Sequence, residues 1–129
     1  YSFKSALNGR DITLITGKMP HRKTVNVFEG MTDFLSLLAM LNVENLSGDS
    51  LILHSLSSFS RASTLIEEQD YQIINTFLDN DNSGNEATQR FKDQFSGRHV
   101  SYRDRYSGYR DLNDVLKAGC FPDFSAPRE

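Results

Sequence analysis

Short apolar segments alternate with amphipathic stretches along the whole chain, and polar turns separate them. Residues 11–16 alternate polar and apolar, which is typical of a half-buried strand at a sheet edge. Residues 50–54 form a continuous apolar run of the kind found in strands that are buried on both faces. In all, the pattern predicts strands at residues 11–16, 24–28, 50–54, 71–78 and 98–102.

The segments between these runs have the spacing of amphipathic helices. We expect helices at residues 33–41 with Thr32 as N-cap, from Ser58 or Ser60 to Glu68, at 85–95 and at 111–118. Strands alternating with helices predict the α/β class. The expected architecture is a central, mostly parallel sheet of about four to five strands, flanked by helices, with an N-terminal edge strand.

Length and composition limit the classes of protein that the chain can belong to. Its 129 residues suit a single domain, 1–129, and 14 basic against 17 acidic residues give a net charge of −3, which excludes a strongly basic nucleic-acid-coating protein. A single cysteine excludes a disulfide framework and a cysteine-rich zinc site. No apolar run approaches the roughly 20 residues of a membrane span, and no signal peptide opens the chain, so we expect a cytoplasmic protein without membrane contact. Because the chain starts at Tyr1, we expect it to be a fragment of a longer protein.

Acidic residues lie just after predicted strands and at the starts of predicted helices. They are Glu29, Asp33, Asp79, Asp81, Asp111 and Asp114. Because parallel strands end at the same rim of a sheet, these side chains are expected to converge there. Two carboxylates about 5 Å apart repel by roughly 3 kcal/mol at an effective dielectric near 20, so the group calls for protons or a cation. Oxygen ligands without a histidine or cysteine cluster favour Mg²⁺ or Mn²⁺ over zinc.

Two other readings of residues 79–84 compete with a metal site. Asp79 and Asp81 could simply cap backbone amides in a turn, because Asp, Asn and Gly dominate turns. The segment also has the first, third and sixth positions of a calcium loop. That loop requires a Glu at its twelfth position, where Arg90 stands, and a helix in front of it instead of a strand, so the calcium loop is rejected.

Three segments occur in a fixed order, FEGMTD at 28–33, LDNDNSG at 78–84 and RDLND at 110–114. Together they resemble the Toprim domain of bacterial primases, type IA and type II topoisomerases and certain nucleases, and the resemblance covers about residues 24–119. The wording of the first segment is most similar to primase-like Toprim proteins of mobile elements. The third motif departs from the family, because its second acid is Asn113, for which the neighbouring Asp114 is a possible substitute.

The resemblance implies roles for the matching positions. Glu29 would be the general acid/base of nucleotidyl transfer or a metal ligand, and Asp79 and Asp81 would hold Mg²⁺ or Mn²⁺. Asp33 and Asp111 would complete the acidic cluster. Gly30 and Gly84 would be supporting residues of the motif turns, since a side chain at position 30 is expected to obstruct the turn that carries Glu29.

A basic, aromatic stretch lies between the last predicted strand and the last predicted helix. Arg103, Arg105, Arg110 and Tyr106 are candidates for contact with the phosphates and bases of a single strand. A solvated loop whose tyrosines cover the core is the alternative.

We therefore expect the Mg²⁺-dependent catalytic core of a DNA primase-like protein, acting on a DNA template and nucleotides in DNA replication or mobile-element transfer. Helicase or zinc-binding modules are expected partners in the parent protein, and the isolated fragment is expected to be weakly active or inactive. Strand cleavage by a nuclease or topoisomerase and a non-catalytic DNA-binding or assembly module stay open. A phosphoaccepting receiver domain lacks the lysine it needs on the last strand, because Lys117 falls in a predicted helix.

Overall fold

The computed structural model describes residues 3–5 and 12–125, and the strands among them form one sheet. The strands are β1 (Phe3–Ser5), β2 (Thr13–Ile15), β3 (Thr24–Phe28), β4 (Asp49–Ile52), β5 (Ile73–Phe77) and β6 (His99–Ser101). Their order across the sheet is β1-β2-β4-β3-β5-β6. The pairs β4–β3, β3–β5 and β5–β6 are parallel, whereas β1 and β2 join antiparallel. The α/β class and the mostly parallel sheet are thereby confirmed.

An N-terminal strand lies at one edge of the sheet, as expected, but it is not the segment that the pattern predicted. The strand expected at residues 11–16 is β2, but it lies one place in from the edge, between β1 and β4. The edge position belongs to β1, whose short polar and aromatic segment carries no clear strand pattern. The described residues therefore form six strands where four to five were expected.

Four helices and three short 3-10 turns connect the described strands. The helices are α1 (Met31–Leu41), α2 (Phe59–Glu68), α3 (Asn82–Gln94) and α4 (Leu112–Ala118), and the 3-10 turns are η1 (Pro20–Arg22), η2 (Leu56–Ser58) and η3 (Arg103–Tyr106). Helix α1 begins two residues before the expected start because Gly30, and not Thr32, is its N-cap. Helix α3 begins three residues early because Asp81 caps it. Within the described ranges, no helix has the length and apolar character that crossing a membrane requires.

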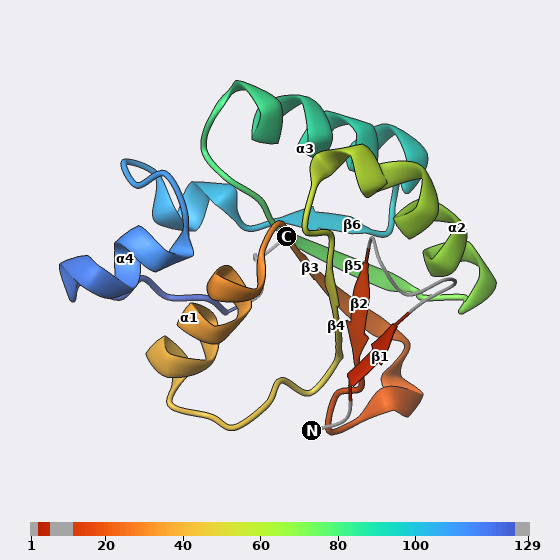
Figure 1. Cartoon of the computed structure of the whole chain (residues 1–129), viewed down its shortest axis with the longest axis horizontal. Helices are drawn as coiled ribbons and strands as arrows, with labels where there is room; N and C mark the ends of the chain where they lie inside the picture. Colours follow the sequence, from red (N-terminus) through yellow and green to blue (C-terminus); the bar gives the residue numbers. More distant parts are fainter. Residues whose placement is uncertain (1–2, 6–11, 126–129) are drawn as a thin grey trace.

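The helices cover the two faces of the sheet in pairs (Figure 1). Helices α2 and α3 pack on one face over a core that includes Val25, Val27 and Leu51. Helices α1 and α4 lie on the other face, where Phe28 and Phe77 belong to the core. Successive residues of β3 thus enter opposite cores, and all four residues from Val25 to Phe28 are buried. This burial on both faces is the reason that β3 carries apolar residues on both sides, with Asn26 as a buried polar exception.

The parallel strands place several helix starts at one rim. Strand β3 leads through Glu29 and Gly30 into α1, and β5 leads through residues 78–81 into α3. The loop after β6 returns to the same rim, where the backbone N–H of Asn80 donates to the carbonyl of Arg110, just before α4 (2.7 Å). The acidic motifs therefore meet at the carboxyl edge of the sheet, as expected for this topology.

Candidate metal centre

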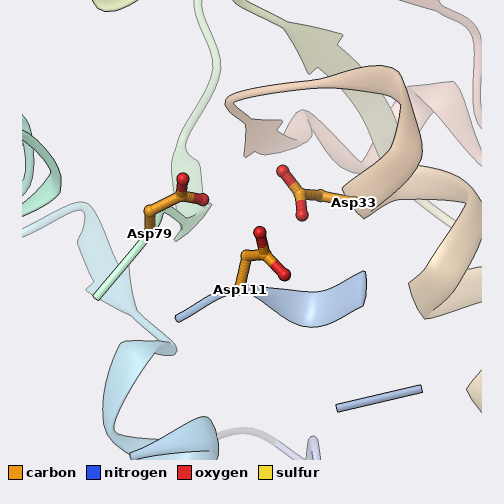
Figure 2. A group of neighbouring side chains, drawn as sticks. All are labelled: Asp33, Asp79 and Asp111. Carbon is orange, nitrogen blue, oxygen red and sulfur yellow. The ribbon is translucent and has the colours of Figure 1, made fainter. Parts of the chain in front are cut away.

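Three aspartates from distant parts of the chain converge at this rim. Asp33 lies in the first turn of α1, Asp79 follows β5, and Asp111 precedes α4. Each offers one carboxylate oxygen, and these three atoms lie within 4.8 Å of one another. Figure 2 shows the three side chains directed toward a common point. The structure thus assembles the oxygen donors that a hard divalent cation requires.

Backbone amides hold two of these carboxylates in place. Asp33 Oδ2 accepts from the N–H of Gly30 (3.3 Å), and Asp111 Oδ1 accepts from the N–H of Asp114 (2.9 Å). Both contacts are capping interactions at a helix N-terminus, where free amides and the helix dipole favour a negative charge. The helix N-termini therefore orient the two carboxylates at the cluster.

Asp79 has no comparable support. Its Oδ1 is buried and has no hydrogen-bond partner within the described part of the chain. The nearest cation to its Oδ2 is Arg110 Nε at 3.9 Å, and only 13% of the side chain is exposed. An unsatisfied buried acceptor costs about 1–3 kcal/mol, and more when it is charged. This orphaned oxygen is what a bound cation would satisfy, so the residues present fit a divalent metal ion.

Burial and mutual repulsion make the cluster hard to ionise without a cation. Burial raises the pKa of Asp79 to about 7, and the neighbouring Glu29 and Asp33 carboxylates add to this rise. Burial also raises the pKa of Asp33 to about 6, with the Asp111 carboxylate as the next cause. Such shifts are typical of functional carboxylates. A cation bound here near neutral pH would therefore displace protons from Asp79 and Asp33.

Glu29 joins the cluster through the backbone of Asp79. Its Oε2 accepts from the N–H of Asp79 (2.7 Å), which ties the end of β3 to the end of β5. Burial raises the pKa of Glu29, although this hydrogen bond acts in the opposite direction. The Glu29 side chain therefore points to the same rim as the Asp79–Asp81 segment, as expected from the sequence.

Asp81 plays a different part from the three aspartates of the cluster. Its Oδ1 accepts from the N–H of Gly84 (2.7 Å) and caps α3. The turn interpretation therefore holds for one oxygen of Asp81, and its Oδ2 lies 3.9 Å from Arg110 Nε. Gly84 is needed for close approach, because a Cβ there would lie 1.9 Å from the carbonyl oxygen of Asp79.

The remaining motif residues lie beside the cluster. Asn113 Oδ1 accepts from Ser36 Oγ (3.4 Å), which links α4 to α1. Asp114 lies 4.0 Å from Lys117 and donates its backbone N–H to Asp111, and its carboxylate is not one of the three clustered groups. At Gly30, a Cβ would meet only Asp33 Oδ2 at 3.8 Å, which is an ordinary contact. The expectation that a side chain at position 30 obstructs the turn is therefore wrong.

Most residues of the loop between β6 and α4 that were expected to contact nucleic acid form hydrogen bonds within the protein instead. The Tyr106 ring is 1% exposed, and its hydroxyl donates to the carbonyl of Leu78 (2.7 Å). A base cannot stack on a buried ring, so the expected role of Tyr106 in binding nucleic acid is corrected to packing beneath the rim. Arg103 donates to the carbonyl of Asp79 (3.1 Å) and to the side chain of Asn85.

The other two arginines of this loop differ in their partners. Arg105 donates to the carbonyls of Asp123 (2.9 Å) and Ser125, so it holds the C-terminal segment. Arg110 is 68% exposed and lies 3.9 Å from both Asp79 and Asp81. Among the four candidates it is the one whose guanidinium remains open to solvent beside the cluster.

Asn80 organises this rim, and sequence reasoning missed it. Its Nδ2 donates to the carbonyls of Arg103, Tyr106 and Tyr109 (3.4, 3.1 and 2.9 Å). These bonds fold the loop after β6 against the end of β5 and so bring Asp111 to Asp79. The available signal was its position between two motif aspartates, which by itself does not distinguish an organising residue from a turn residue.

Comparisons with known proteins agree with this geometry. The model of the family described as Toprim-like matches residues 26–116. No curated protein matches the chain in sequence. The primase fragment of the bacteriophage T7 primase-helicase protein is similar in structure, with a TM-score of 0.59, 19% identity and 74% of this chain covered.

A second T7 structure gives the same similarity. It contains primase domains of two gp4 subunits, bound to an RNA/DNA hybrid and dTTP and interacting with the lagging-strand DNA polymerase. The TM-score is again 0.59 at 19% identity, over 74% of this chain. The match spans 39% of the first T7 chain and 48% of the second, so this chain corresponds to less than half of either.

Proposed function

The chain belongs to the Toprim-like family, and we propose that it is the metal-dependent catalytic core of a primase-like protein that transfers nucleotides. The observation that carries the proposal is the convergence of Asp33, Asp79 and Asp111, where a buried Asp79 oxygen has no hydrogen-bond partner in the part of the chain that the structure describes. A module that serves only as a platform gains nothing from such a cluster, because its repulsion opposes folding. The structural similarity to T7 primase fragments supports the synthetic direction.

Asp33, Asp79 and Asp111 would hold Mg²⁺ or Mn²⁺, and Oδ2 of Asp81, which lies 3.9 Å from Arg110 Nε, is a further candidate ligand. When bound, such an ion neutralises the charge that develops on the phosphate oxygens during transfer. The backbone contacts of Asp33 and Asp111 hold their carboxylates at the cluster before any ligand arrives. This preorganisation lowers the cost of ordering the site.

Glu29 is the proposed general base. Its Oε2 is engaged by the N–H of Asp79, so Oε1 is the atom available to take a proton. In the proposed step the 3′-hydroxyl oxygen attacks the α-phosphorus of a nucleoside triphosphate, its proton passes to Glu29 Oε1, and the bond to pyrophosphate breaks. The raised pKa of Glu29 brings its proton affinity closer to neutral pH, where proton transfer is efficient.

Arg110 is the proposed phosphate contact. Its exposure and its place beside Asp79 and Asp81 let its guanidinium reach a triphosphate or a template phosphate at the cluster. Arg103 and Arg105 support the loop in this proposal, because their guanidinium groups already bind backbone carbonyls.

The wider setting is part of the same proposal. Because the chain spans less than half of the T7 chains, the parent protein would supply template binding and helicase or zinc-binding modules. The biological process would be DNA replication or mobile-element transfer, in the cytoplasm.

Metal titration tests the proposal directly. We expect Mn²⁺ binding, followed by calorimetry, to weaken at least tenfold in Asp79→Asn and in Asp111→Asn, because each change removes a charged ligand. The matched control is Asp93→Asn on the exposed side of α3, which should bind Mn²⁺ as the parent chain does. Equal affinity in Asp79→Asn and the parent chain would refute the proposed centre.

Strand cleavage by the same cluster is the competing enzymatic function. A topoisomerase reaction needs a tyrosine nucleophile; Tyr71, Tyr102 and Tyr106 are at most 5% exposed, and among the described tyrosines only Tyr109 is partly exposed. Incubation of the parent protein with single-stranded template, labelled nucleotides and Mg²⁺ separates the two reactions. Extended products support synthesis, and nicked template without extension supports cleavage.

A further inference from the structure

Asn80 stands between two motif aspartates in the chain, and it contacts the loop that connects β6 to α4. Its Nδ2 donates to three carbonyls of that loop, those of Arg103, Tyr106 and Tyr109 (3.4, 3.1 and 2.9 Å). Its backbone N–H donates to a fourth carbonyl, that of Arg110 (2.7 Å). A single residue after β5 is therefore bonded along the loop up to its last position before α4 is capped.

The partners of the Asn80 side chain require an amide at this position. Carbonyl oxygens only accept hydrogen bonds, and the NH₂ group of asparagine carries two hydrogens to donate. The two shorter contacts have ordinary hydrogen-bond lengths, and the contact of 3.4 Å is long. Aspartate is equally common in turns, but it would direct a carboxylate at the same three oxygens. The surroundings therefore distinguish asparagine from aspartate, which an ordinary turn does not.

Other contacts hold the beginning of the same loop. The Tyr106 hydroxyl and the Arg103 guanidinium donate to carbonyls within residues 78–79 (2.7 and 3.1 Å). The bonds from Asn80 reach the last two residues before Asp111. They therefore act on the part of the loop that leads directly into this aspartate.

Asp111 depends on this loop more than the other two aspartates of the cluster do. Asp33 follows β3 after a short turn and Asp79 directly follows β5, and these two strands are paired in the sheet. Asp111 is separated from β6 by residues 102–110. The capping bond from the N–H of Asp114 orients its carboxylate on α4, but it does not fix α4 relative to β5. Figure 2 shows the Asp111 side chain nevertheless directed toward Asp33 and Asp79.

We propose that Asn80 is a positioning residue of the metal centre, whose amide holds the end of the loop so that Asp111 reaches the other two aspartates. The inference rests on the proposed metal centre and adds to it a residue that need not touch the ion or the substrate. Charge and position make opposite predictions for Asn80→Asp. By charge alone, a further carboxylate beside the cluster favours a cation. By position, it repels the loop carbonyls, displaces Asp111 and weakens the cation.

Calorimetry with Mn²⁺ distinguishes these two outcomes. We expect Asn80→Asp to bind Mn²⁺ at least threefold more weakly than the parent chain. The matched control is Asn82→Asp, which adds the same charge on the other side of Asp81, at an exposed position in the first turn of α3, and should bind at least as tightly as the parent chain. A smaller loss in Asn80→Asp, or an equal loss in the control, would overturn the proposal.

A double-mutant cycle tests whether Asn80 acts through Asp111, and it does not require Asn80→Asp to fold. Asn80→Ala should weaken Mn²⁺ at least threefold in the parent chain. In the Asp111→Asn background it should weaken Mn²⁺ less than twofold, because the ligand that it displaces is already lost. A merely structural role moves the melting temperature and leaves the two factors equal, and equal factors would overturn the proposal.

The same titrations separate this inference from the proposed function. If the parent chain binds no Mn²⁺, both are refuted. If Asp111→Asn weakens Mn²⁺ and the Asn80 variants do not, the metal centre stands and the positioning role of Asn80 is refuted.

Discussion

Asp49 and Asp79 lie at opposite edges of the sheet, Asp49 at the amino edge and Asp79 at the carboxyl edge. The groups that surround the two carboxylates differ sharply. Asp49, at the start of β4, accepts from the N–H of Gly17 (2.8 Å) through one oxygen and from the Tyr71 hydroxyl (2.6 Å) through the other. Asp79, after the end of β5, has one buried oxygen without a partner among the described residues and one that faces Arg110 at 3.9 Å. The first carboxylate is committed to structure, and the second is left open for a ligand.

This difference follows from what surrounds each end of the sheet. At the amino edge, a turn and a tyrosine bring neutral donors to Asp49. At the carboxyl edge, several other carboxylates lie around Asp79 and raise its pKa further. A buried carboxylate that accepts hydrogen bonds stabilises the folded state. Clustered carboxylates without donors destabilise it, and such clusters are typical of sites that bind a ligand.

The largest expected effect concerns the turn that carries Asp79. Gly84→Ala should destabilise the domain by about 3 kcal/mol, because its Cβ would overlap the Asp79 carbonyl at 1.9 Å and the backbone must shift. Urea unfolding measures the change. Gly30→Ala, whose Cβ meets only an ordinary contact at 3.8 Å, is the control and should cost less than about 1 kcal/mol. Similar losses in both variants would show that the turn at Gly84 is no tighter than the one at Gly30.

The comparison of the two aspartates predicts changes of opposite sign. In EDTA at pH 8, Asp49→Asn should lower the free energy of unfolding by about 2 kcal/mol, because one of its two donors loses its acceptor. Asp79→Asn should raise it by about 1 kcal/mol, because a buried charge among like charges is removed. Urea unfolding of both variants checks the signs. A loss of stability in Asp79→Asn would mean that its carboxylate is satisfied after all.

The raised pKa values at the carboxyl edge predict how stability varies with pH. The folded pKa of Asp79, about 7, and that of Asp33, about 6, lie above the usual value of 3.8, so the folded state binds more protons than the unfolded state in between. The resulting stability is present below pH 4 and is lost as the pH rises through 6 and 7. Between pH 6 and 8 in EDTA, these two groups should lower the unfolding free energy by about 1–2 kcal/mol.

His99 acts in the opposite direction, and a variant separates the two effects. Burial lowers the pKa of His99 to about 4, so its contribution to stability rises as the pH increases from 4 toward its unfolded value of 6.5. The difference between the parent chain and Asp79→Asn cancels this contribution. That difference should grow from pH 6 to 8, and a constant difference would contradict the raised pKa of Asp79.

The elements of the fold were accessible from the sequence because their signals are local. The central strands β3, β4 and β5 carry mostly buried side chains, and their apolar residues give a local strand signal although Asn26, Ser50 and Thr76 lie among them. Strand β1 was missed because three residues at an edge carry no periodicity. The start of α3 was placed late because Asp81 was weighed as a ligand or turn residue, while its side chain caps the helix.

The candidate site was predictable in outline and not in its atoms. The motifs at residues 28–33, 78–84 and 110–114 placed Glu29, Asp33, Asp79 and Asp111 at one rim. The burial of Tyr106 and the internal contacts of Arg105 could not be predicted from the sequence. A loop that alternates tyrosine and arginine has the same sequence pattern whether its rings face a ligand or the core. Asn80 shows the same limit, since its three carbonyl partners are 23 to 29 residues away in the chain.

Residue order alone determined the alternation of strands and helices and the edge of the sheet at which the acidic residues gather, because both depend on periodicity and on the shared direction of parallel strands. Tertiary packing decided which carboxylate is satisfied, which is left with an orphaned oxygen and which arginine stays open to solvent. Those outcomes depend on hydrogen-bond donors from distant segments of the chain. Which donors reach which carboxylates is determined by how the helices and loops pack against the sheet.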